Sequence, residues 1–193
     1  WQLRGLSFPC ADRPPRLLDG GAYDNTGLEA IDSDRYRDVF TVSLNAGGLF
    51  HAGAYGRLPV LGELARVNAL LYRQSTALRT RWMVERFERG RVVPDGAEIP
   101  PDARRGVLVA LATDLEPGDD GGALAAWHAA HPPLRTWDGR DLALVATTFD
   151  RYPPGLCRAL VYRGWWLVGA ALCRYHPTLV PDPAALAPPA VDP

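Results

Sequence analysis

Lysine is absent from this 193-residue sequence, because all 21 of its basic residues are arginines. The chain therefore cannot use a Schiff-base lysine, a lysine general base or the lysine of a phosphate-binding loop. Acidic residues number 22, so the formal net charge is −1. A charge this close to zero gives no reason to expect nucleic acid as a partner.

Cysteine is scarce as well: Cys10, Cys157 and Cys173 are an odd number, and none belongs to a Cys-x-x-Cys pair. This pattern predicts free thiols in a reducing compartment, and hence a cytoplasmic protein. The histidines do not fall at ligand spacing beside the cysteines, so we expect no metal site. We also expect no cofactor. His128 and His131 lie three residues apart and can share one face of a helix, where we predict a surface pair.

Long apolar runs are also missing. The longest, residues 165–173, is far shorter than the roughly 20 residues that a membrane-spanning helix needs. Tyr162, Trp165, Trp166 and Leu167, in or beside this run, could form an interfacial patch that rests on a bilayer. Packing of these side chains into a helical core is the interpretation that we favour.

Hydrophobic residues make up 47% of the sequence, which is typical of one globular domain with a sizeable core. Runs of β-branched and aromatic residues predict two buried strands, at residues 38–44 and 106–112, in an α/β sheet. Apolar periodicity and proline positions predict helices from Pro59 to about Arg89, over 123–130, over 141–149, and from Pro153 or Pro154 to about Tyr175.

The helix from Pro59 is the longest predicted element, and Gly90 is expected to end it. Its apolar stripe comprises Leu61, Leu64, Val67, Leu71, Leu78, Trp82 and Phe87. Charged residues occupy most of the other face, which we expect to be solvated and ion-paired. Beyond Pro177 the chain is rich in proline and is expected to fray.

The segment that carries chemistry runs from Leu17 to Glu29. Two leucines place Asp19 in a loop at the edge of the predicted core, and Gly20 and Gly21 follow at once. Glycine tolerates positive φ and lets backbone or substrate come close. Partial shielding from water raises the pKa of a carboxylate and suits it to accept a proton. On spacing alone, however, Asp-Gly-Gly more often marks a tight turn than a catalytic site.

The longer pattern Asp19-Gly20-Gly21-x-Tyr23-Asp24-Asn25-x-Gly27-Leu28 resembles the aspartate motif of the patatin-like phospholipase family, in the form common among bacterial members. Residues 74–82 are similar to the long helix that follows in those members, and residues 146–149 and 160–166 are similar to their later segments. The resemblance covers the chain from about residue 8 to residue 179.

This resemblance implies an α/β fold, the second half of a patatin-like three-layer architecture with a central mixed sheet flanked by helices. That domain would span residues 1–180, followed by a Pro-rich tail at 181–193. It implies a Ser-Asp dyad that hydrolyses a lipid ester, reached at a membrane surface, through an acyl-enzyme. Asp19 matches the catalytic base, and Gly20 and Gly21 match neighbours that shape the site.

The sequence departs from this family pattern at the nucleophile. None of its serines, Ser7, Ser33, Ser43 and Ser75, lies in a Gly-x-Ser-x-Gly elbow, and no early Gly-rich oxyanion loop is present. Ser43 lies within a predicted strand, where we expect a structural role. We therefore expect the serine upstream of Trp1, in an N-terminal half that completes the site, and we expect this chain alone to be inactive.

Two other interpretations compete with the hydrolase. A non-catalytic binding or scaffold module that retains the fold is favoured by the missing serine elbow. A phosphate or nucleotide binder that uses residues 45–48 is the least favoured, because that tetrapeptide has neither the Gly-x-Gly-x-x-Gly nor the Gly-Lys-Ser signature.

Overall fold

A computed structural model describes residues 27–46, 59–118, 122–134, 136–145 and 151–190. Asp19, Gly20 and Gly21 lie outside the described residues. The elements follow one another along the chain as α2 (Leu28–Ile31), η1 (Asp34–Tyr36), β1 (Thr41–Asn45), α3 (Pro59–Arg91), β2 (Gly106–Ala110), α4 (Ala123–Ala130), α5 (Gly139–Ala143), α6 (Pro154–Tyr175), η2 (Pro177–Leu179) and η3 (Pro183–Ala185).

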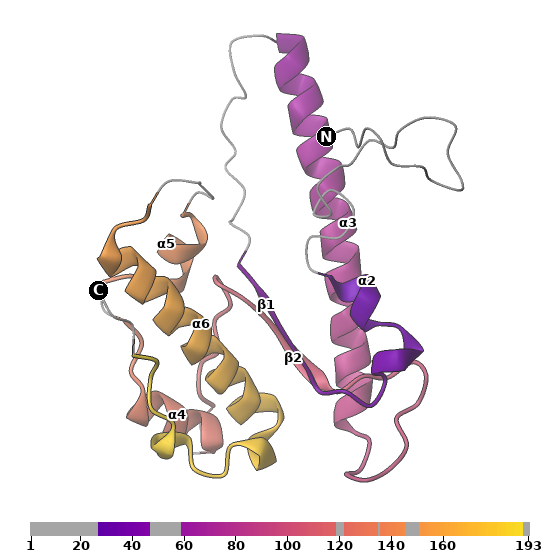
Figure 1. Ribbon diagram of the computed structural model, residues 1–193, viewed down its shortest axis with the longest axis vertical. Coiled ribbons are helices and arrows are strands. Elements are labelled where there is room, and N and C mark those ends of the chain that lie inside the picture. Colours follow the sequence, from indigo (N-terminus) through magenta and orange to yellow (C-terminus); the bar gives the residue numbers. More distant parts are fainter. Residues whose placement is uncertain (1–26, 47–58, 119–121, 135, 146–150, 191–193) are drawn as a thin grey trace, which may run out of the picture.

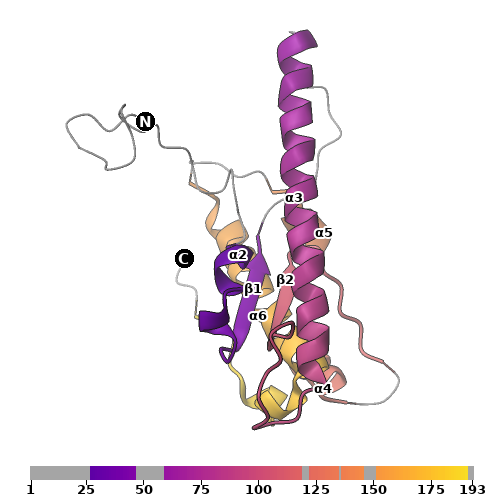
Figure 2. The ribbon, with the colours of Figure 1, turned by 90° about the vertical axis from the view of Figure 1, so that its right-hand side faces the viewer.

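Strands β1 and β2 pair in parallel, with Thr41 opposite Gly106 and Asn45 opposite Ala110. Both predicted strands are thus confirmed, although β1 begins at Thr41 rather than Asp38. Helix α6 packs on one face of the pair, chiefly against β2, and α3 packs against β2 from the other face, as Figure 1 and the turned view of Figure 2 show. The described residues hold only this parallel pair, so the mixed sheet and the patatin-like architecture stay predictions.

Alternation along β2 divides the apolar core between the two helical layers. Val107 and Val109 are 2% and 1% exposed and belong to the cluster on the α6 side. Leu108, on the opposite face of the strand, packs against Met83 and Phe87 of α3. Because both faces of β2 are covered, its sequence reads as a continuous apolar run, as parallel strands usually do.

The α6 side holds the larger core. Trp127 of α4 and Leu167 of α6 are both 0% exposed, and Trp166 is 3% exposed. The Trp166 indole N–H donates to the carbonyl of His131 at 2.7 Å, so its one polar atom is satisfied. Core packing is thereby confirmed for Trp166 and Leu167, and a membrane-resting patch built on these two side chains is excluded.

Gly90 does not end α3, contrary to the sequence prediction, because the helix continues to Arg91. The glycine serves close packing instead. A Cβ at this position would overlap the backbone carbonyl of Arg104, whose amide in turn donates to the carbonyl of Arg86 at 3.0 Å. The loop that leads to β2 therefore passes directly over the α3 backbone at Gly90.

Among the stripe residues of α3 whose side chains the structure describes, burial is confined to the C-terminal end of the helix. Phe87 is 2% exposed, whereas Val67, Leu71, Leu78 and Trp82 are 43–60% exposed. These four side chains are therefore not part of a core, and the first half of α3 projects past the other described elements (Figure 1). No helix among the described residues combines the length and apolar character that crossing a bilayer requires.

The remaining elements match their predictions unevenly. Helices α4 and α6 occupy the predicted residues, and α6 begins at Pro154. Helix α5 is shorter than the predicted 141–149, since it ends at Ala143 with Leu144 as its C-cap, and residues 146–149 lie outside the described chain. The expected fraying after Pro177 is wrong as far as Ala185, because η3 packs against α4.

Candidate functional site

The aspartate motif enters the described structure at its last two residues. Gly27 has φ +65°, a left-handed conformation that favours glycine, and it forms the N-cap of α2. Leu28 follows with 1% exposure and packs with Met83 and Phe87 beneath the sheet. The segment that carries Asp19 is therefore followed by a helical turn whose first side chain is part of the core.

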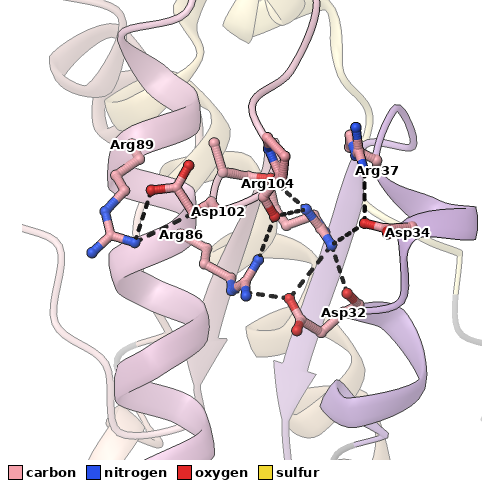
Figure 3. Close-up of polar contacts among 9 residues, drawn as sticks. Asp32, Asp34, Arg37, Arg86, Arg89, Asp102 and Arg104 are labelled. Carbon is pink, nitrogen blue, oxygen red and sulfur yellow. Dashed lines mark hydrogen bonds and ion pairs between the residues drawn. The ribbon is translucent and has the colours of Figure 1, made fainter.

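Four charged side chains hold the segment after the motif in place. We call them the Asp32 cluster: Asp32, Asp34, Arg86 and Arg104 (Figure 3). Arg104 is 1% exposed, and its Nη2 donates to the Asp32 carbonyl at 2.5 Å and lies 3.7 Å from Asp32 Oδ1. Arg86 Nε lies 3.1 Å from the same carboxylate oxygen. That contact is an ion pair without hydrogen-bond geometry.

The Nη1 atoms of the two arginines bind the loop before β2. Arg104 Nη1 donates to the carbonyls of Ala103 at 2.7 Å and Pro101 at 3.0 Å, and Arg86 Nη1 reaches Pro101 at 2.8 Å. Arg86 also lies over the ring of Trp82, 4.2 Å from its centroid. The cluster thus joins the segment after α2, helix α3 and the β2 loop through one buried guanidinium.

The pKa values of the two acids of the cluster shift in opposite directions, because burial dominates for Asp32 and pairing with an arginine dominates for Asp34. Burial raises the pKa of Asp32 above its ordinary value, and the positive charges of Arg86 and Arg104 offset only part of that effect. Asp34 is exposed, and a 2.8 Å hydrogen bond from Arg37 lowers its pKa. Both carboxylates are paired with arginines, so the cluster positions the chain and offers no general base.

A cavity of about 420 Å³ lies where the chain leaves β2, between α5 and α6. We call it the α5–α6 cleft. In α/β sheets, ligands commonly bind outside the carboxyl ends of parallel strands, which is where this cavity lies. Its walls are Ala112, Asp114, Pro133, Leu134, Trp137, Asp138, Gly139, Arg140, Tyr162, Arg163 and Trp166.

Arg163 is the fixed cation of the α5–α6 cleft. Its Nε donates to the carbonyl of Leu111 at 3.2 Å and its Nη2 to the carbonyl of Thr113 at 2.6 Å, just beyond β2. Its guanidinium also lies 5.1 Å from the ring centroid of Trp166. Burial lowers the pKa of Arg163, while the negative charges of Asp114 and Asp138 oppose that shift. The side chain is therefore charged and held rigidly.

A second, more open hollow of about 610 Å³ adjoins this cleft and shares Leu134, Trp137 and Tyr162 with it. We call it the apolar groove. The Tyr162 hydroxyl donates to the Pro132 carbonyl at 2.9 Å, and burial raises its pKa, so the ring is held as a neutral wall. Its other walls are Thr136, Gly155, Arg158, Ala159, Pro188 and Pro189.

The histidines near α4 have structural contacts. His128 Nε2 donates to the Leu115 carbonyl at 2.7 Å, and His131, 7% exposed, donates through Nε2 to Pro183 at 2.8 Å. The predicted surface pair is therefore wrong, because each ring fastens a different loop to α4. Within the described part of the chain, no three His, Cys, Asp or Glu side chains gather into a group that could hold a metal ion.

Sequence reasoning missed the residues that organise both sites. Arg104 and Arg163 were two arginines among 21, and no sequence pattern assigned either of them a role in a site. Their partners are backbone carbonyls, which no side-chain pattern reveals. The α5–α6 cleft likewise draws its walls from three separate stretches of chain. The tetrapeptide proposed as a phosphate loop begins at Asn45, the last residue of β1, but Gly47 and Gly48 lie outside the described residues.

Comparison of the chain with models of known families, with curated proteins and with solved structures finds no match. The patatin-like resemblance thus stays a prediction that rests on the motif around Asp19.

Proposed function

We propose that this chain is the aspartate-bearing part of a patatin-like lipid acyl hydrolase, with Asp19 as the general base of a Ser-Asp dyad. One observation carries the proposal: the ten-position motif around Asp19 ends in Gly27, whose φ is +65°, and in Leu28, which is 1% exposed. A catalytic base must be held within a narrow range of positions, and a motif that continues directly into the core meets that need.

Helices pack on both sides of the parallel strand pair, and this arrangement also supports the proposal. Nucleophile elbows and their partner acids belong to α/β sheets with helices on both faces. The Asp32 cluster adds a further fixed point, because Asp32 lies shortly after the motif and is tied to α3 and to the β2 loop. The segment that leaves Asp19 is thus fastened at Leu28 and again at Asp32.

The reaction has two steps. The carboxylate of Asp19 accepts the hydroxyl proton of a serine supplied by the N-terminal half, and the serine oxygen attacks the ester carbonyl. The alcohol leaves with that proton, and water then releases the carboxylic acid from the acyl-enzyme. Gly20 and Gly21 would let substrate approach the carboxylate. We place this reaction in the cytoplasm at a membrane surface, and the free thiols of Cys157 and Cys173 support a reducing compartment.

Replacement of the base in the complete protein tests the proposal. Asp19→Asn should lower kcat/KM for a p-nitrophenyl ester by about 10²–10⁴-fold, the usual contribution of a general base. Asp95→Asn is the matched control, because the Asp95 side chain is 91% exposed and pairs with Arg105 at 3.7 Å. This control should leave the rate unchanged. An Asp19→Asn enzyme of undiminished activity would remove the dyad assignment.

A non-catalytic binding or scaffold module is the second candidate. The positions of two serines favour it. Ser43 is 9% exposed within β1 and Ser33 precedes η1, and neither lies in a Gly-x-Ser-x-Gly elbow. A fluorophosphonate probe separates the two candidates, because it labels only an activated serine. The hydrolase predicts labelling of the complete protein that Asp19→Asn abolishes. The module predicts no labelling of either form.

A further inference from the structure

We propose that the α5–α6 cleft and the apolar groove together bind a monocarboxylate with an apolar chain. The carboxylate would lie beside Arg140 and Arg163, and the chain would lie in the groove. This inference goes beyond ester hydrolysis and needs neither Asp19 nor a serine. It depends on the arginines, the sign of the local charge and the continuity of the two hollows.

The two arginines of the cleft have hydrogen-bond donors that are not used within the described residues. Arg163 spends Nε and Nη2 on two backbone carbonyls, and among the described residues its Nη1 has no acceptor. Arg140 is exposed at the rim, and its guanidinium has no ion-pair partner within the described residues. A carboxylate between them would receive charge-assisted hydrogen bonds from a guanidinium that is already fixed, so little ordering cost remains.

The balance of charge selects a single negative charge. The cleft itself carries two arginines, Arg140 and Arg163, and two acids, Asp114 and Asp138, so the one net positive charge of the combined site is that of Arg158 in the groove. Asp138 is engaged already, because its Oδ1 accepts from the Asp141 amide at 2.6 Å and caps α5. One positive charge is left over, which matches a carboxylate and disfavours a phosphate dianion.

The groove supplies the apolar part of the site. Leu134, Trp137 and Tyr162 belong to both hollows, so an apolar chain that leaves the arginines of the cleft would pass along these three shared side chains into the groove. Ala159 forms part of the groove and is 4% exposed. Volumes of about 420 and 610 Å³ lie within the range of about 300–1,000 Å³ that small-molecule sites occupy.

Titration calorimetry of the intact 193-residue chain with three probes of equal length tests the charge requirement. Octanoate should bind at least about tenfold more tightly than 1-octanol, and octyltrimethylammonium should bind most weakly, since it brings a like charge to Arg140 and Arg163. Equal affinity for the three probes would overturn the proposal, because binding would then reflect an apolar surface alone.

Two variants test the two ends of the site separately. Arg140→Gln should weaken octanoate binding about tenfold and leave octanol unchanged, because it removes only a charged donor. Arg151→Gln is its control, since Arg151 is also exposed but lines neither hollow. Gly155→Trp should weaken both probes, because a Cβ on Gly155 meets no atom within 4 Å and the added ring can fill the groove.

The outcomes separate this inference from the proposed function. Asp19→Asn should bind octanoate like the unmodified chain, even where the complete enzyme has lost activity. Octanoate affinity that survives both Arg140→Gln and Gly155→Trp would overturn the site. An equal loss from Arg151→Gln would do so too, because it would reveal an unspecific effect of surface charge.

Discussion

Arg104 joins separate segments of the described chain, and no sequence pattern predicted that it would. Its guanidinium is almost fully buried and donates to the carbonyls of Asp32, Pro101 and Ala103. Removal of the guanidinium takes a donor away from each of these three carbonyls, and of the two arginines only Arg86 still donates to Pro101.

Arg104→Met should therefore lower the free energy of unfolding by about 3–5 kcal/mol, since Asp32 would be left half-buried beside a single arginine. Arg104→Lys should also destabilise the chain, because one ammonium group cannot reach all of these acceptors. Urea denaturation measures both. Arg89→Met is the control: its pair with Asp102 is 3.4 Å long and exposed, so its loss should cost less than about 1 kcal/mol. Equal stability of Arg104→Met and the unmodified chain would contradict this account.

His176 should make stability depend on pH. Its Nε2 donates to the Gly106 carbonyl at 3.2 Å, and Phe40 meets its ring edge-on at 5.0 Å. Burial lowers its pKa from the ordinary 6.5. The positive charges of Arg91 and Arg105 add to that shift, while the Gly106 hydrogen bond and Asp95 oppose it. The unfolded chain therefore binds more protons than the folded chain just below pH 6.5.

The free energy of unfolding should consequently fall as the pH is lowered below about 6.5, until the folded-state pKa is passed. His176→Gln keeps a donor for Gly106 and cannot titrate, so its unfolding free energy should vary less over this window. Urea denaturation of both proteins at matched pH values measures the difference, which cancels the contribution of the other histidines. Parallel pH profiles would contradict the assignment.

At the scale of the element, Gly90 shows how the usual preference for glycine just after a helix can predict the wrong helix end. Glycine after an amphipathic stretch usually marks a C-terminus, but here the helix continues and glycine makes room for the Arg104 carbonyl. Gly90→Ala would raise helix propensity, yet it should destabilise the chain by about 1–3 kcal/mol through overpacking. Gly155→Ala, in α6, is the matched control in urea denaturation.

That control should be neutral or slightly stabilising, because its Cβ would enter open space. A Gly90→Ala chain more stable than the unmodified one would place the loop before β2 farther from α3 than the structure has it.

Elements that depend on local signals were predictable from sequence. β-branched runs placed both strands, and Pro154 marked the start of α6. Elements that depend on tertiary contacts were not. The spacing of Val67, Leu71 and Leu78 is helical, but spacing cannot tell whether a partner lies opposite, and all three are more than half exposed. His131 resembled a surface residue because its partner, Pro183, lies far along the chain.

At the scale of the whole molecule, the two candidate sites differ in whether they can be predicted from the sequence. Asp19 is found from a contiguous motif, because its neighbours in sequence are also its chemical context. The α5–α6 cleft brings Asp114, Asp138 and Arg163 together from separate stretches of chain. The turn after β2, the segment that leads into α5, and α6 must all be in place before that cleft exists. No one-dimensional pattern could therefore have predicted it.

The end of the described chain belongs to this assembly rather than to a loose tail. Val180 is 5% exposed, and η3 places the Pro183 carbonyl on the Nε2–H of His131. Asp182 caps η3 through a 3.1 Å bond to the Ala184 amide. A chain that stops at Pro181 should therefore lose about 1–2 kcal/mol of unfolding free energy, the value of a hydrogen bond together with newly exposed apolar surface.

Truncation after Ala187 keeps η3 and is the matched control, so it should unfold at the same urea concentration as the unmodified chain. Proteolysis offers an independent measure, because loss of η3 should expose the turn between α4 and Pro132 to cleavage before the rest of the chain unfolds. If both truncations were as stable as the unmodified chain, the η3 contact would contribute nothing, and the packed domain would end near Val180 as the sequence suggested.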